Sequence, residues 1–171
     1  MIGTESAIAM EAMPMMLCVL RVGHTLFGIE ASHICEVLGE MPSKLVPLAP
    51  KYIDGVVPYR GEVLTAISLR MLLGLETTRD TSCVLVLNDD EADERFGLVV
   101  DAVEGLMTVA CDALEPNPSS LDEQSMFLFD GLYRTKSTLM VRLNTQQLRP
   151  ARIAQTGLFE QASNERSGWI Q

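Results

Sequence analysis

The stretch YRGEVLTAISLR, residues 59–70, decides the fold class of this chain. Its second half alternates between two sets of positions, one of which holds Val63, Thr65, Ile67 and Leu69. A period of two residues is the signature of a half-buried β-strand. Gly61 directly follows Arg60 and permits a tight turn before that strand. The stretch therefore predicts a β-hairpin with an arginine at its turn.

Similar short segments, rich in β-branched residues and separated by turn residues, recur along the chain. This pattern is typical of small barrels and sandwiches. Gly23 and His24 form the predicted turn of a first hairpin. Besides residues 63–69, the predicted strands are 16–22, 25–30, 55–58, 83–88, 96–100, 106–109, 131–134 and 139–143.

The predicted helical segments in the first half are brief. Ser32 is expected to cap a turn or two that carries Ile34, Val37 and Leu38 on one side. Ser68 is expected to cap a second turn that stops at Gly74. Neither segment is long enough to form a layer of its own, so the class stays mainly β.

The second half adds three helical segments. Ser120 and Glu123 match the capping-box pattern of a helix start. Asn144 is expected to start a turn that contains Leu148. Residues 151–161 are predicted to form an amphipathic helix, with Ile153 and Leu158 as its apolar anchors.

The two halves of the chain also resemble each other. Phe27-Gly28-Ile29 leads to Glu36-Val37, and Phe96-Gly97-Leu98 leads to Glu104-Gly105-Leu106 at nearly the same interval. A second set of four residues has counterparts further on: Gly55, Arg60, Leu64 and Leu69 match Gly131, Arg134, Leu139 and Leu143. Two matched halves of about 70 residues predict duplicated small β-barrels.

Composition excludes several classes of function. Hydrophobic residues make up 47% of the chain and the formal charge is −10, without a basic stripe. A nucleic-acid partner and an anionic membrane surface are therefore not expected. No apolar run approaches the roughly 20 residues that span a bilayer. The acidic run at residues 89–94 is expected to be a solvated loop, and the N-terminus lacks the basic residues of a secretory signal.

The residues that carry chemistry do not form a recognisable catalytic or metal site. The four cysteines, at 18, 35, 83 and 111, lack metal-ligand spacing and indicate reduced, mostly buried thiols. His33 and Cys35 stand two residues apart on a predicted helical turn, where they point to different sides. We therefore expect neither an enzyme nor a bound cofactor or metal.

The order of the landmarks resembles the CheW family of chemotaxis adaptors along residues 16 to about 149. The landmarks are ICEV at 34–37, VPLAPKYIDGV at 46–56, YRGEVLTAISLR at 59–70, FGLVVDAVEGL at 96–106 and LEPNP at 114–118. Gly131 and residues 139–143 complete the series. Each piece is weak alone, but their order and spacing together are specific.

The resemblance implies a fold and a set of partners. The fold would be two SH3-like five-stranded β-barrels with short helices and a C-terminal helix. One barrel would dock a domain of a CheA-type histidine kinase, and a groove between the barrels would take the helical cytoplasmic tip of a chemoreceptor. The protein would be a cytoplasmic, non-enzymatic adaptor without a cofactor, and a homo-oligomer would be compatible with this role.

The expected domain organisation follows from the same resemblance. Residues 1–15 would be a flexible leader and 151–171 a C-terminal helix and tail. The CheW-like part would span residues 16–150, with subdomain one at roughly 16–90 and subdomain two at roughly 91–150.

The expected interaction residues are Ile34, Glu36, Val37, Arg60, Gly61, Val103 and Leu106. At a barrel edge, Arg60 can donate several hydrogen bonds to a partner, or it can brace the junction of the two barrels. The apolar members are either core residues or the floor of a groove. The sequence alone leaves both pairs of alternatives open.

Some residues depart from the family pattern. Pro58-Tyr59 replaces the usual Asn-Leu before Arg-Gly, and Pro58 requires an edge strand or a bulge because it lacks an N–H. Ser68 and Asn144 stand where the family has aspartates. One alternative is a scaffold of the same fold that serves a non-motility array, such as a surface-sensing one, or that binds other signalling proteins without controlling a kinase. A more remote alternative is a small hydrolase or ligand-binding barrel using His33 and Cys35.

Overall fold

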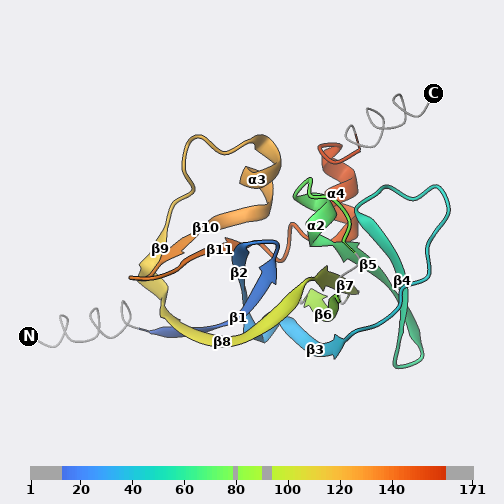
Figure 1. Ribbon diagram of the computed structural model, residues 1–171, viewed down its shortest axis with the longest axis horizontal. Coiled ribbons are helices and arrows are strands. Elements are labelled where there is room, and N and C mark those ends of the chain that lie inside the picture. Colours follow the sequence, from blue (N-terminus) through green and yellow to red (C-terminus); the bar gives the residue numbers. More distant parts are fainter. Residues whose placement is uncertain (1–12, 79–80, 90–93, 161–171) are drawn as a thin grey trace, which may run out of the picture.

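Figure 1 shows the computed structural model, which describes residues 13–78, 81–89 and 94–160. The strands are β1 (Pro14–Val22), β2 (Thr25–Glu30), β3 (Ile34–Gly39), β4 (Ile53–Tyr59), β5 (Glu62–Ser68), β6 (Cys83–Asp89), β7 (Glu94–Val100), β8 (Ala102–Ala110), β9 (Leu114–Glu115), β10 (Phe129–Arg134) and β11 (Leu139–Leu143). The helices are η1 (Ala31–His33), α2 (Leu69–Leu72), η2 (Cys111–Ala113), α3 (Glu123–Leu128) and α4 (Pro150–Thr156).

The strands form two sheets. Sheet A has the order β8-β1-β2-β11-β10-β9, and sheet B has the order β3-β6-β7-β5-β4. The prediction of a mainly β fold with two subdomains and short helices is confirmed. Two details differ from closed five-stranded barrels, because both sheets are open and sheet A gains the two-residue strand β9.

The sheets divide the strands differently from a boundary near residue 90. Strands β1 and β2 pair with β8 and β11 in sheet A, whereas β3 to β7 make up all of sheet B. The chain therefore crosses from sheet A to sheet B at η1 and returns between β7 and β8. These two crossings place strands β3 and β8, which carry five of the seven expected interaction residues.

The main core lies between the sheets. It contains side chains from one face of each sheet, together with apolar side chains from the three α-helices, including Leu72, Leu128 and Ile153. The opposite face of sheet A holds a smaller cluster around Tyr133 and Met140. The opposite face of sheet B holds two small clusters around Val57 and Tyr59. In Figure 1 the α-helices of the described residues, α2, α3 and α4, lie on the same side of the molecule.

The repeated Phe-Gly-aliphatic motif has one structural explanation in both halves. Phe27 and Phe96 belong to the main core. Alternation turns the intervening glycine toward the opposite face of its sheet. A Cβ on Gly28 would lie 3.1 Å from the Met140 sulfur, and one on Gly97 would lie 3.2 Å from a Val84 methyl group. The narrow space on those faces therefore accounts for a glycine at each position.

A second pair of glycines occupies equivalent bulges. Gly55 in β4 and Gly131 in β10 both have a φ of 153°, and each lies at a register shift in its hairpin. A Cβ would approach a carbonyl oxygen to 2.3 Å at both positions, that of Lys44 or Glu115. The matched halves seen in the sequence thus correspond to matched backbone geometry.

The most consequential correction concerns residues 34–39, for which the sequence predicted helical turns. Only η1 is helical, and Ile34–Gly39 form strand β3, which pairs with β6. Glu30 is the N-cap residue of η1, so Ser32 lies inside this helix and does not cap it. The Glu30 side chain makes no capping hydrogen bond either. The β-branched residues Ile34 and Val37 favour a strand once β6 is available as a partner.

Helix capping follows the prediction at two positions and departs from it at a third. The Ser68 hydroxyl accepts a hydrogen bond from the Met71 N–H at 3.2 Å, and the Asn144 side chain accepts bonds from the backbone of the next turn. Helix α3 is capped by Asp122, which accepts from the Ser125 N–H, and not by Ser120. An aspartate two residues closer to the apolar run is an equally good cap.

The C-terminal segment joins the two sheets. Ile153 of α4 is fully buried, as expected, but the second anchor is Phe159, because Leu158 is only half-buried. The Phe159 ring lies 6.3 Å from the rings of both Tyr52, which precedes β4, and Phe127 of α3. The Gln124 amide also donates to the Leu158 carbonyl at 2.7 Å. Helix α4 spans Pro150–Thr156, shorter than the predicted 151–161.

Some expectations fall outside the described residues. Most of the proposed leader, the C-terminal residues 161–171 and the centre of the acidic run at 90–93 are among them.

Candidate interaction site

The turn of the β4–β5 hairpin brings two expected residues together. The Arg60 guanidinium lies 3.2 Å from a Glu36 carboxylate oxygen on β3. Strands β3 and β4 are the two edges of sheet B, so this ion pair joins its edges. Both side chains are accessible, with 73% of the Arg60 side chain and 38% of the Glu36 side chain exposed.

The backbone of this turn is held in an unfavourable conformation. Tyr59 pairs with Glu62, so Arg60 and Gly61 form a two-residue loop with φ values of 46° and 80°. Two positive φ angles are those of a type I′ turn, in which asparagine followed by glycine is the preferred sequence. An arginine at the first position is uncommon. Strain of this kind concentrates at functional sites.

Tyr59 contacts both members of the Arg60–Glu36 pair. Its side chain is buried and its ring lies 5.3 Å from the Arg60 guanidinium, within the range of a cation–π contact. Burial raises the pKa of the Tyr59 hydroxyl, and a hydrogen bond to Glu36 raises it further. Tyr59 therefore contacts both charged residues of the turn.

The apolar candidates divide into two kinds. Ile34 and Val103 are half-buried and pack against the main core. Val37 and Leu106 are exposed, at 46% and 65%. One residue of β3 and one of β8 thus belong to the core, and one residue of each strand belongs to the accessible surface.

The structure does not gather all seven residues at one place. Five of them, from Ile34 to Gly61, belong to β3 and the β4–β5 turn of sheet B. Val103 and Leu106 belong to β8 of sheet A, which Figure 1 shows running away from the β4–β5 turn. There are therefore two candidate surfaces, a turn surface around Arg60 and a strand surface formed by the exposed residues of β8 and β3.

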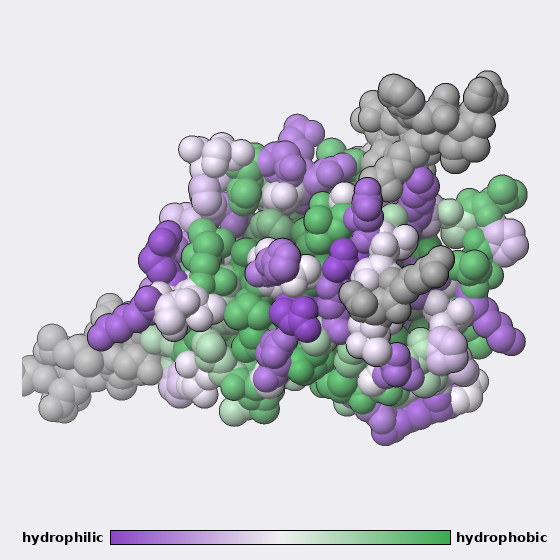
Figure 2. Space-filling view, viewed as in Figure 1, coloured by the Kyte–Doolittle hydropathy of each residue, from purple (hydrophilic) through white to green (hydrophobic). Residues whose placement is uncertain are grey.

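Sequence reasoning missed several exposed apolar residues. Leu45 and Leu48 in the loop between β3 and β4 are 84% and 105% exposed, and Leu48 has a φ of 65°. Val63, which pairs with the exposed Pro58 beside the turn, is 71% exposed. Figure 2 shows hydrophobic side chains over the loop that precedes β4, at the right margin of the view. Leucines beside prolines in a segment without periodicity were the signal available in the sequence.

The residues considered for chemistry are placed apart. His33 lies in η1 with its Nδ1 atom 2.7 Å from the Thr145 hydroxyl, whereas Cys35 is an exposed residue of β3. Among the described residues, no group of three or more histidine, cysteine or acidic side chains could hold a metal ion. The prediction of mostly buried thiols holds for Cys18 and is wrong for Cys35 and Cys111.

In the described part of the chain, no helix combines the length and the apolar character that crossing a bilayer requires.

Comparison with known proteins identifies the family. Residues 16–151 match the family model of the CheW-like domain, so the chain belongs to the CheW-like family. The probable chemotaxis protein CheW of Rhizobium etli is 31% identical over 111 residues, which cover 63% of this chain and 72% of that protein. The chemotaxis protein CheW of Helicobacter pylori is 24% identical over 130 residues, covering 74% of this chain and 76% of its own.

A solved structure supports the same fold. The scaffolding protein TtCheW from Thermoanaerobacter tengcongensis superposes with a TM-score of 0.69 at 21% sequence identity. The match covers 77% of this chain and 90% of that protein. The family predicted from the order of landmarks is therefore confirmed.

Proposed function

We propose that this protein is a non-enzymatic, cytoplasmic adaptor that couples methyl-accepting chemoreceptors to a CheA-type histidine kinase. Membership of the CheW-like family and the chemotaxis names of its relatives support a scaffold role in chemotaxis. The observation that carries the proposal is the turn surface: an accessible, strained Arg60–Glu36 pair beside the exposed apolar side chain of Val63.

The turn surface has the composition of a protein-binding edge. Exposed apolar anchors with a charged rim are typical of recognition surfaces. Here the anchor is Val63, which pairs with Pro58 beside the turn, and the rim is the Arg60–Glu36 pair. An arginine that keeps most of its guanidinium accessible can still donate several hydrogen bonds to a partner. We assign this surface to the kinase.

The strand surface suits a different partner. Leu106 of β8 and Val37 of β3 are exposed, and each lies near a half-buried neighbour that packs on the main core. Spaced apolar side chains on a rigid base suit the apolar face of an amphipathic helix. We assign this surface to the helical tip of a receptor.

The experiment that tests the proposal mixes the full chain with the CheA-type kinase and the receptor cytoplasmic fragment of its own source. Size-exclusion chromatography reports the complex, and kinase autophosphorylation reports control of activity. We expect a ternary complex in which phosphorylation increases. Absence of any complex with the kinase would contradict the proposal.

Charge reversal at Arg60 tests the assignment of the turn surface. Arg60→Glu should weaken kinase binding at least tenfold while the receptor fragment still binds. Arg152→Glu is the matched control, because Arg152 is an exposed arginine of α4, far along the chain from the turn, whose Nε donates to the nearby Gln147 side chain. Equal losses in both variants would indicate a general charge effect and would contradict the assignment.

A further inference from the structure

The chain crosses between the sheets twice. At each crossing, a polar side chain forms hydrogen bonds to at least one of the two sheets that the crossing connects. At the second crossing, Asp101 is the single residue between β7 of sheet B and β8 of sheet A. At the first crossing, η1 connects β2 of sheet A to β3 of sheet B. The two crossings are therefore the places where the relative position of the sheets is set by the backbone itself.

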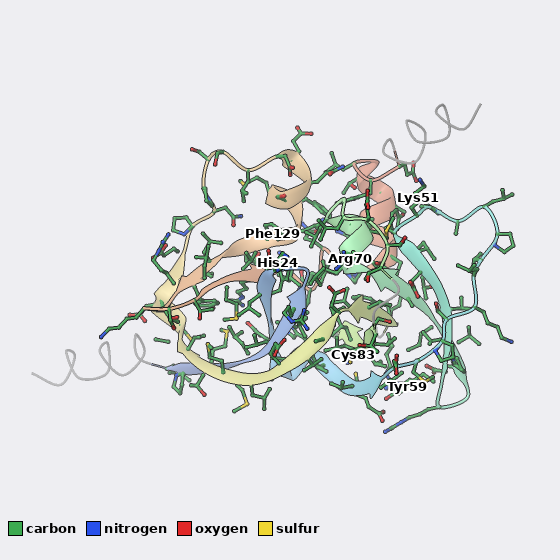
Figure 3. The ribbon with its side chains drawn as sticks, in the orientation of Figure 1. His24, Lys51, Tyr59, Arg70, Cys83 and Phe129 are labelled. Atoms are coloured by element: carbon green, nitrogen blue, oxygen red, sulfur yellow. The ribbon has the colours of Figure 1, made fainter. Side chains whose placement is uncertain are left out.

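Asp101 bonds to both sheets. Its carboxylate accepts two hydrogen bonds from Arg70 of α2, which follows β5 of sheet B, at 3.2 and 2.7 Å. It also accepts from the Gly23 N–H, in the β1–β2 turn of sheet A, at 2.7 Å. Its own N–H donates to the Arg21 carbonyl at 3.0 Å. Only 15% of the Asp101 side chain is exposed, and Figure 3 shows Arg70 beside α2 at the centre of the molecule.

His33 plays the reciprocal part. It precedes β3 of sheet B directly, and a 2.7 Å hydrogen bond joins its Nδ1 atom to the Thr145 hydroxyl, in the loop that follows β11 of sheet A. Its Nε2 atom lies 3.3 Å from the Glu30 carboxylate at the end of β2. A strand of each sheet is thus anchored, at its first residues, to the other sheet.

The main core packs the two sheets together, but apolar contacts are not directional by themselves, and the hydrogen bonds at the crossings add direction. A two-bond arginine–carboxylate pair has a defined geometry as well as a favourable energy. Ile34 follows the first crossing immediately, and Val103 lies two residues after Asp101. Both crossings therefore lie next to the first residues of the two strands that carry the strand surface.

We propose that Asp101 and His33 are positioning residues that set the angle between β3 and β8, and through it the affinity of the strand surface for a helical partner. The part that concerns affinity rests on the proposed function, whereas the part that concerns the angle does not. The two parts can be tested separately.

The test uses the full chain and three single variants. Asp101→Asn keeps an acceptor for Gly23 but loses the charge that pairs with Arg70, and Thr145→Val removes the hydroxyl that His33 contacts. Glu115→Gln is the control, because it removes an exposed ion pair with Arg134, between β9 and β10 of sheet A, that involves neither crossing and neither β3 nor β8. Residual dipolar couplings of the backbone amides report the relative orientation of the sheets.

We expect the couplings of each sheet to fit its own native geometry in every variant. In Asp101→Asn and Thr145→Val a single alignment frame should no longer fit both sheets, and binding of the receptor fragment should fall about tenfold. Glu115→Gln should match the native protein in both measurements.

Two results would contradict parts of this proposal. A single common frame in both crossing variants would overturn the positioning role. A native protein that does not bind the receptor fragment at all would instead contradict the proposed function, while the couplings would still decide the role of the crossings.

Discussion

Arg60 is tied to Glu36 across the two edges of one sheet, at 3.2 Å, and not across the junction between the sheets. Of the two roles that the sequence left open, bracing between subdomains therefore does not match this contact. An ion pair with 73% of one side chain exposed contributes at most about 1 kcal/mol to stability. The strained arginine at the turn is better explained by what it offers to a partner.

Replacing Arg60 by asparagine separates stability from binding. Because Asn-Gly is the preferred type I′ sequence, Arg60→Asn should raise the free energy of unfolding by about 0.5–1 kcal/mol, measured by urea titration. The same variant should bind the kinase more weakly, as calorimetry would show. A variant that loses stability would contradict the account of strain at this turn.

Gly55 and Gly131 should respond alike to substitution. Alanine at either position would combine a positive φ with a Cβ 2.3 Å from a carbonyl oxygen. We expect each variant to lose more than about 2 kcal/mol of stability in thermal unfolding. Gly39→Ala is the control, since Gly39 has a φ of 71° but open space around it and should lose only about 1 kcal/mol. Equal losses at all three sites would show that the close approach adds nothing.

Phe159 should be a major anchor although it lies beyond the family match. Its ring is 6% exposed and contacts aromatic rings that belong to both halves. Phe159→Ala should therefore cost about 3–5 kcal/mol, measured by chemical denaturation. Leu158→Ala, at a half-buried neighbour, should cost clearly less. The reverse order would mean that the original prediction of Leu158 as the anchor was right.

The Asp101–Arg70 pair should make stability depend on pH. Hydrogen bonds from Arg70 hold the pKa of the Asp101 carboxyl below its ordinary value of about 4, and the Gly23 N–H adds to this effect. The unfolded chain then binds a proton more readily than the folded one, so the contribution is complete above that value and declines as pH falls through the folded pKa.

Asp101→Asn measures this contribution. Urea unfolding at pH 7 should show a loss of about 1–3 kcal/mol relative to the native protein. The difference should shrink as the pH is lowered below 4, where the native carboxyl takes up its proton. A difference that stays constant from pH 7 to pH 3 would show that the pair does not act through ionisation.

The sequence predicted most strands because their apolar positions alternate locally. It failed at β3, where Ser32 and the spacing of Ile34, Val37 and Leu38 matched a helical turn equally well. The deciding contact is pairing with β6, about 50 residues later in the chain, which local periodicity does not encode. The predicted cap of α3 was wrong for a smaller reason, because Ser120 and Asp122 are both good cap residues and lie two positions apart.

The candidate site was likewise predicted from the sequence only in part. Arg60 and Glu36 were each predicted from the family landmarks, but their pairing depends on how far sheet B curls. Leu45 and Leu48 went unnoticed because no period predicts the exposure of a loop residue. The assignment of strands to sheets also lay beyond local patterns, because β2 pairs in parallel with β11.

That assignment has a consequence for synthesis on the ribosome. Sheet B is built from one continuous stretch, residues 34–100, so all its strands can pair as soon as that stretch has emerged. Sheet A needs both ends of the chain, and β2 must wait for β11, more than a hundred residues later. Translation at about 5–20 residues per second leaves the β1–β2 hairpin without its neighbours for several seconds. The two halves share matched backbone geometry, but their sheets form at different times because of the order of the strands along the chain. Sheet B is complete early, and sheet A then closes against it.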